Sequence, residues 1–196
     1  MHSTILSLVH EPHYYDPHHI LHTPSAEVPK SSFLNSVSDF KGQRVASNIK
    51  DFAHILIKTM RHHKGLGLSA VQVGVQLKII VLDINLNENN SLRNSGVVMV
   101  NARVINRSAE IKDNVEGCLS FGNIYPKIYR SKEVEIKYLD LDQKEQTWYG
   151  SDDIMVACVQ HEIDHTEGRV FTDRISNSNE RNRQLKKYYK WRRKQT

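Results

Sequence analysis

The residues with the clearest chemistry are two histidines and a glutamate in the segment His161-Glu162-Ile163-Asp164-His165. On a helix, histidines four positions apart lie one turn apart on the same face, so both imidazoles can reach one metal ion. Glu162 then stands beside the metal and can take a proton from a water molecule. The pattern therefore predicts the centre of a metal-dependent hydrolase. The alternative is a surface helix that carries two histidines and several acids by chance.

A catalytic site of this kind needs a third protein ligand, and the sequence narrows where it lies. Metzincins have a third histidine where this chain has Phe171, although Gly168 fits their pattern. Thermolysin-type enzymes use a glutamate from a later helix, but the glutamates that remain downstream, Glu167 and Glu180, do not suit this role. The ligand is therefore expected upstream, with Cys118 the strongest candidate. Read alone, a single free cysteine is more often a small core residue.

A third segment, Gly65–Gln72, is rich in small and apolar residues. It is not a dinucleotide-binding fingerprint, because it follows a predicted helix rather than a strand, and no Gly-Lys-Ser/Thr of a P-loop follows it. Its glycines can serve merely to end that helix. Gln72 is its one polar amide, and a buried amide needs hydrogen-bond partners. Its NH₂ group is able to donate to a developing oxyanion.

The elements that must position these residues follow from hydrophobic spacing. Apolar residues at helical intervals predict a helix over Arg44–His63. A second helix is expected over Asp152–Thr166, capped by Ser151, and a third from Asn177 into the C-terminal end. Between the first two, four β-rich runs are found: Leu77–Leu86, Val97–Ile105, Lys132–Leu141 and Glu145–Tyr149. The order predicts an α+β fold with largely antiparallel sheets around the helix that carries the two histidines.

Charge and composition restrict the function further. The chain has a formal net charge of +5, with 27 basic and 22 acidic residues among 196. Eight of the basic residues lie in 181–196, which contains no acid, so the rest of the chain is mildly acidic and does not resemble a DNA-binding domain. Two cysteines are too few for a disulfide framework. No signal peptide and no apolar run of the ~18–20 residues needed to span a membrane is found, so a cytoplasmic protein is expected.

Together, the three segments resemble peptide deformylase of the bacterial type. That family carries a GxGxxAxQ motif, an EGCLS motif and an HExDH motif, and these stand here as Gly65–Gln72, Glu116–Ser120 and His161–His165. The resemblance extends over roughly residues 11–175. It implies a catalytic domain over 1–176, followed by a basic helical tail over 177–196.

The resemblance also implies the roles of the central residues. Cys118, His161 and His165 would hold one divalent metal ion, with iron(II) the usual native ion and zinc or nickel as alternatives. Glu162 would act as general base and then as acid, while Gln72 and the backbone N–H of Leu119 would stabilise the oxyanion. The substrate would be the N-formylmethionyl end of a nascent peptide, and formate would be released.

Further residues are implied in substrate binding and in support of the site. Leu66, Gly67 and Gly117 would offer backbone groups to a peptide bound as an added strand. Ile154 and Cys158 would wall the methionine pocket, with plain core packing as the alternative. Glu116 and Arg130 would form an ion pair behind the ligands.

This chain departs from the family pattern at a few positions. Gly122 stands where the family usually has proline, so the rim of the site is expected to be looser and the subsites beyond methionine are left open. Thr166 replaces a common leucine, and Ser69 a frequent alanine. None of these positions is a predicted ligand or the predicted base, so a working enzyme is expected.

The composition of the basic tail predicts where the protein acts in the cell. Its basic residues, from Arg181 to Lys194, alternate with aromatic ones, a composition that suits RNA. Some bacterial members of the family dock at the ribosome through such a helix, so docking at the ribosome is expected here. The protein is expected to be a monomer. The alternative is a frayed, solvated helix. Two rival functions remain: a catalytically silent ribosome-associated binding protein on the same fold, and a general metallopeptidase.

Overall fold

The computed structural model describes residues 4–10, 12, 16, 18–83, 96–151 and 154–195. Its described part holds three α-helices, which are α1 (Ile49–His62), α2 (Ile154–Thr166) and α3 (Ser178–Arg192). The strands are β1 (Val37–Ser38), β2 (Arg44–Ala46), β3 (Gly67–Ser69), β4 (Ile79–Leu82), β5 (Val97–Arg107), β6 (Ile111–Val115), β7 (Lys127–Ser131), β8 (Glu133–Leu139) and β9 (Glu145–Ser151). Short 3₁₀ segments are η1 (Ile20–His22), η2 (Lys30–Ser32), η3 (Ala70–Val73), η4 (Leu119–Phe121) and η5 (Phe171–Arg174). The predicted α+β class is confirmed.

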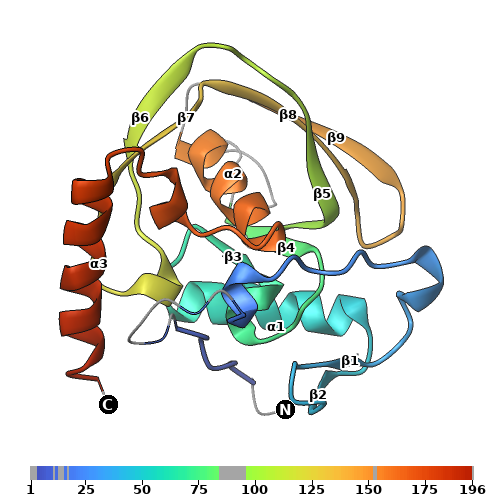
Figure 1. Cartoon of the computed structure of the whole chain (residues 1–196). Coiled ribbons are helices and arrows are strands. Elements are labelled where there is room, and N and C mark those ends of the chain that lie inside the picture. Colours follow the sequence, from blue (N-terminus) through green and yellow to red (C-terminus); the bar gives the residue numbers. More distant parts are fainter. Residues whose placement is uncertain are drawn as a thin grey trace.

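The strands form one sheet of five, in the order β3-β4-β5-β8-β9, and two hairpins, β1-β2 and β6-β7. Every pair of neighbouring strands in these sheets is antiparallel. Figure 1 shows α2 enclosed by an arch of strands, with α1 below it and α3 at one edge of the molecule. The helix that carries both histidines is therefore central, as predicted.

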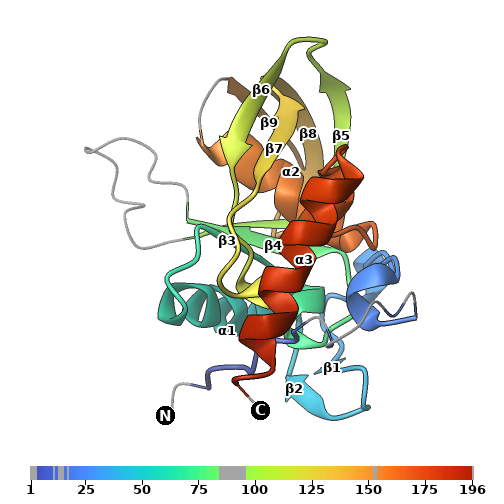
Figure 2. The same cartoon turned by 60° about the vertical axis from the view of Figure 1, so that its left-hand side comes forward.

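Helix α2 is held there by its apolar side. Val156, Val159 and Ile163 pack with Ile80 and Ile136 of the five-stranded sheet in one buried cluster. Figure 2, turned by 60°, shows α2 again behind the β6-β7 hairpin and beside β8. From Val159 to Thr166 every residue of α2 is buried, so polar residues there need partners, and they find them at the site described below.

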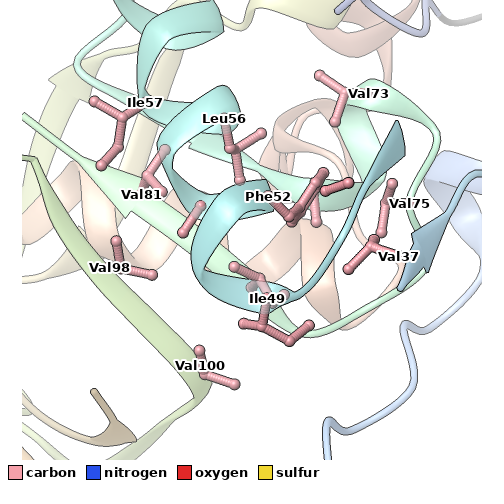
Figure 3. Close-up of a cluster of buried hydrophobic side chains, with 14 of the residues drawn as sticks. Val37, Ile49, Phe52, Leu56, Ile57, Val73, Val75, Val81, Val98 and Val100 are labelled. Atoms are coloured by element: carbon pink, nitrogen blue, oxygen red, sulfur yellow. The ribbon is translucent and has the colours of Figure 1, made fainter. Parts of the chain in front are cut away.

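Helix α1 is shorter than predicted. The expected start at Arg44 is wrong, because Arg44–Ala46 forms β2 and pairs with β1. The helix begins at Ile49, since the side chain of Asn48 accepts a hydrogen bond from the N–H of Asp51 (2.8 Å) as an N-cap. From there the predicted apolar face is buried, with Phe52 and Leu56 at the centre of a cluster that packs on β4 and β5 (Figure 3).

The predicted strands are found, with shifted ends. The run Leu77–Leu86 gives β4 over Ile79–Leu82, and its last residues lie outside the described ranges. The pairing of Lys132–Leu141 with Glu145–Tyr149 is confirmed by the register of β8 and β9, in which Ile136 faces Trp148. The β6-β7 hairpin was not predicted, because its exposed face mixes charged residues with apolar ones.

The ends of α2 and α3 differ in how well they follow the prediction. The predicted cap at Ser151 is wrong, because Ser151 is the last residue of β9 and its hydroxyl donates to Glu133 (3.2 Å). Asp152 and Asp153 lie outside the described residues. Asn177 caps α3 as predicted, accepting from the N–H of Glu180 (3.0 Å). No helix in the described part of the chain is long and apolar enough to cross a membrane.

The chain leaves α2 through a glycine, and this turn yields a stability prediction. Gly168 has φ +72°, and a Cβ there would lie 2.8 Å from backbone atoms of residues 22–24. Gly42 has a similar φ of +79°, but nothing lies within 4 Å of its Cβ position. Gly42→Ala should lower the free energy of unfolding by about 1 kcal/mol from backbone strain alone. Gly168→Ala should lower it by at least about 2 kcal/mol, because backbone must also move.

Urea unfolding of the two variants measures this difference. Equal losses would show that the packing of residues 22–24 against the end of α2 contributes nothing.

Candidate active site

Three potential metal donors meet where α2 passes the segment that follows β6. The donor atoms of Cys118, His161 and His165 all lie within 4.8 Å of one another, and all three residues are buried. The Sγ atom of Cys118 is 3.3 Å from Nε2 of His165. Burial, together with the nearby His161, holds the pKa of His165 well below its usual range, which favours the neutral imidazole that binds metals.

The orientation of His161 is set by Glu116. Nδ1 of His161 lies 2.9 Å from Oε2 of Glu116, so this nitrogen donates a hydrogen bond to the carboxylate. The other ring nitrogen, Nε2, is then available as a metal donor beside Cys118 and His165. Burial would raise the pKa of Glu116, but hydrogen bonds from Arg130 and His161 more than offset it and hold that pKa below its usual range. Glu116 is therefore an ionised acceptor that orients the imidazole.

A buried ion-pair network holds Glu116 in turn. Arg130 donates from Nε (2.5 Å) and Nη2 (2.9 Å) to the two oxygens of Glu116, the predicted partner. Its third nitrogen, Nη1, donates to Asp164 (2.7 Å), and Asp164 also accepts from Arg174 (3.1 Å from Nε). Asp164 and Arg174 were not predicted as site residues. A carboxylate inside a buried helix was the available signal, since it requires a cationic partner.

Glu162 stands apart from this network. Its side chain is only 4% exposed, and Oε2 has no hydrogen-bond partner among the described residues. Burial raises the pKa of Glu162 to about 7. The backbone of Gly67 approaches it so closely that a Cβ at this glycine would lie 2.7 Å from Oε1. A buried carboxylate with one oxygen that is not engaged in a structural bond is suited to proton transfer.

The amide of Gln72 is oriented by Ser69. Its Oε1 accepts from the backbone N–H (2.9 Å) and the hydroxyl (3.1 Å) of Ser69. The NH₂ group therefore faces the donor cluster, where Nε2 lies 3.5 Å from Sγ of Cys118 and 3.3 Å from Oγ of Ser120. The serine that replaces the family's frequent alanine adds one of the two bonds that fix this amide.

A cavity of about 800 Å³ opens onto these groups. Ile154 is 64% exposed at its wall, so core packing does not explain this residue. Arg130 and His165 are not part of the wall but lie buried behind it. Several rim residues were not predicted, among them Tyr125, whose ring lies against Gly117. The predicted site residues that line the cavity are Leu66, Gly67, Gln72, Glu116, Gly117, Cys118, Leu119, Ile154, Cys158, His161 and Glu162.

Known proteins similar to this chain identify its family. Residues 13–181 match the family model described as Polypeptide deformylase. This chain belongs to the peptide deformylase family. The match includes all three predicted motifs and the first residues of α3.

Relatives of known name agree. Peptide deformylase from Bartonella quintana (strain Toulouse) is 37% identical over 134 residues, which cover 68% of this chain and 74% of that protein. A crystal structure of peptide deformylase from Ehrlichia chaffeensis in complex with actinonin has a TM-score of 0.74 and 29% identity, covering 95% of this chain and 97% of that one. A Met-Ala-Ser-bound structure of class I type b peptide deformylase from Acinetobacter baumannii has a TM-score of 0.70 and 26% identity, covering 88% and 99%.

Membership of the family gives the activity. The chain is a hydrolase that removes the N-formyl group from the N-terminal formylmethionine of newly made polypeptides and releases formate. Peptide deformylases depend on a metal ion, and the cluster of Cys118, His161 and His165 is able to hold one.

The ion-pair network yields a second prediction, for two residues of the same strand. Arg130→Met should lower the free energy of unfolding by about 3–5 kcal/mol, because it leaves Glu116 and Asp164 buried without their shared cation. Lys127→Met, in the same strand as Arg130, removes the exposed ion pair with Asp113 of β6 and should leave stability nearly unchanged.

Urea unfolding of both variants is the measurement. A small loss for Arg130→Met would mean that the two carboxylates accept protons or water at little cost.

Proposed function

We propose that the deformylase reaction takes place in this cavity, with Cys118, His161 and His165 as the ligands of one divalent metal ion. The donor set supports this, since one sulfur and two imidazole nitrogens converge within 4.8 Å and the imidazole of His161 is fixed from behind by Glu116. When bound there, a metal ion would lower the pKa of a water molecule to about 7 and would polarise the formyl carbonyl. We assign iron(II) as the native ion, with zinc or nickel as substitutes, and metal analysis of protein purified without oxygen tests it.

The protein's own groups then carry the proton and the charge. Glu162 accepts the proton of the attacking water at Oε2 and passes it to the leaving amine, whose C–N bond breaks to give formate and a free amino terminus. The NH₂ group of Gln72 and the backbone N–H of Leu119 donate to the oxygen that becomes negative. Removing one such donor typically reduces the rate by about 10²–10³.

The substrate is held as an additional strand. β3 is one of the two edge strands of the five-stranded sheet and lies at the cavity, so its unpaired side is available to an extended peptide. The carbonyl of Leu66 already accepts from Asp83 (2.8 Å), so its N–H is the group we assign to the peptide, together with the backbones of Gly67 and Gly117. Ile154 and Cys158 wall the pocket for the methionine side chain.

The third prediction tests the base. Glu162→Gln should keep the shape of the site and the bound metal but reduce formate release from formyl-Met-Ala-Ser by about 10²–10⁴, since general base catalysis is lost. Glu167→Gln, an exposed glutamate just beyond α2, is the matched control and should remain active. Formate is measured directly, and bound metal is quantified for each protein.

The same assay separates the rival functions. No formate from wild-type protein with full metal content would favour a silent binding protein. Cleavage of an unformylated peptide would favour a general metallopeptidase. Either result would overturn the proposed function.

The place of action is also part of the proposal. We propose that the catalytic domain of residues 1–176 acts as a cytoplasmic monomer, and that the tail of 177–196 docks it at the ribosome through basic residues between Arg181 and Lys194. The exposed face of α3 carries Lys186, Lys187 and Lys190, which supports contact with RNA phosphates. The aromatic residues do not support stacking on bases, because Tyr188 is buried and Tyr189 and Trp191 are partly covered.

The fourth prediction tests this docking. Changing Lys186, Lys187 and Lys190 together to glutamine should weaken co-sedimentation with ribosomes and flatten its dependence on salt. Three exposed lysines elsewhere, Lys41, Lys50 and Lys58, form the matched control triple. Equal binding of both triples would contradict docking through α3, and formate release by each shows that the domain is intact.

A further inference from the structure

The C-terminal helix packs against the back of the loop that carries Cys118. The side chain of Tyr188 is 0% exposed, and its hydroxyl donates to the carbonyl of Ser120 (3.4 Å). Its ring centroid lies 5.1 Å from that of Phe121, and Phe121 is equally close to Phe171 (5.1 Å). In both Figure 1 and Figure 2 the yellow segment that contains η4 reaches the lower half of α3. This contact lies directly behind the donor cluster.

Gly122 shows how closely the helix approaches. It has φ +58° and ψ −121°, a conformation that essentially only glycine adopts and that proline cannot reach. A Cβ at this position would lie 2.3–2.6 Å from three ring carbons of Trp191. The indole of Trp191 therefore occupies the space that any side chain at position 122 would need. A looser rim was expected at this glycine, but the indole of Trp191 packs directly against it.

His10, near the N-terminus, also contacts this loop. Nδ1 of His10 lies 3.2 Å from the carbonyl oxygen of Ser120, and its ring is 6.0 Å from that of Trp191. The carbonyl of Ser120 thus has partners from both ends of the chain. On the opposite side of the loop, the hydroxyl of Ser120 and the thiol of Cys118 face Gln72.

We infer that Tyr188 and Trp191 of α3 are positioning residues for the loop 118–122, and so fix where the Cys118 sulfur and the Leu119 N–H stand. This rests on the roles proposed for Cys118 and Leu119. The loop has one conformation because α3 and Gln72 hold it from two sides, and neither its glycine nor its short 3₁₀ turn would hold it alone. The basic tail therefore contributes to catalysis as well as to any docking.

The decisive variants are Trp191→Ala and Trp191→Phe. Trp191→Ala should reduce kcat per bound metal about tenfold, the lower end of what loss of a supporting residue costs, while KM for formyl-Met-Ala-Ser changes little. Trp191→Phe keeps a ring over Gly122 and should restore most of kcat. Trp148→Ala is the matched control: it removes an indole from β9, in a different core cluster, and should lower the melting temperature without lowering kcat.

A spectroscopic measurement separates positioning from stability. In the cobalt(II)-loaded protein, the charge-transfer absorption of the Cys118 thiolate reports on the place of the sulfur, and Trp191→Ala should shift or weaken it. Gly122→Ala should have a similar effect, because its methyl group displaces the indole. In a double-mutant cycle the two changes should be less than additive, since both break one contact.

The outcomes are distinct. If the wild type releases formate but Trp191→Ala keeps its kcat and its cobalt spectrum at a lowered melting temperature, α3 only stabilises the fold and the inference fails. Strict additivity of Gly122→Ala and Trp191→Ala would equally overturn it. If the wild type itself releases no formate, the proposed function fails instead.

Discussion

The buried guanidinium of Arg130 is the constraint on which the site depends. It binds Glu116, which follows β6, and Asp164 of α2, so three separate segments are brought into one register around a single cation. Such buried pairs add little net stability, because desolvation consumes most of the Coulombic gain. What they supply is specificity of arrangement. Glu116 orients the His161 imidazole only because Arg130 holds both of its oxygens, and the donor cluster inherits that orientation.

The charge count around this network explains why Glu162 behaves differently from its neighbours. Two guanidinium groups, Arg130 and Arg174, match two carboxylates, Glu116 and Asp164, and the pKa of each of these carboxylates is lowered despite burial. Glu162 is a third buried carboxylate without a cation of its own, and burial raises its pKa. If Cys118 holds a divalent ion as a thiolate, as proposed, the two together would carry one net positive charge, which an ionised Glu162 would balance. The uneven distribution of partners thus sets the proposed base, Glu162, apart from two structural carboxylates.

Sequence reasoning succeeded where the signal is local. The helical spacing of His161 and His165, the alternation in β8 and β9 and the cap at Asn177 are all set by neighbouring residues, and the structure has them. It failed where distant segments decide. Val45 continues the apolar spacing of α1, but it lies in β2 because that segment pairs with β1. The two arginines that bind Asp164 come from β7 and η5. In α3 the density of basic charge obscured the fact that Gln184, Tyr188 and Trp191 share one face.

The departure at position 122 and the aromatic face of α3 are two halves of one solution. A proline restricts its own φ to about −65°, so a loop that contains it is stiffened from within the chain. Glycine has no such restriction and loses more conformational freedom than any other residue when it is ordered. Its positive φ here must therefore be held by tertiary contact, and Trp191 supplies that contact while partly burying its own ring. Because the helical repeat turns the lysines outward and the aromatics inward, one helix is able to present charge to a partner and, as inferred above, to hold the loop 118–122.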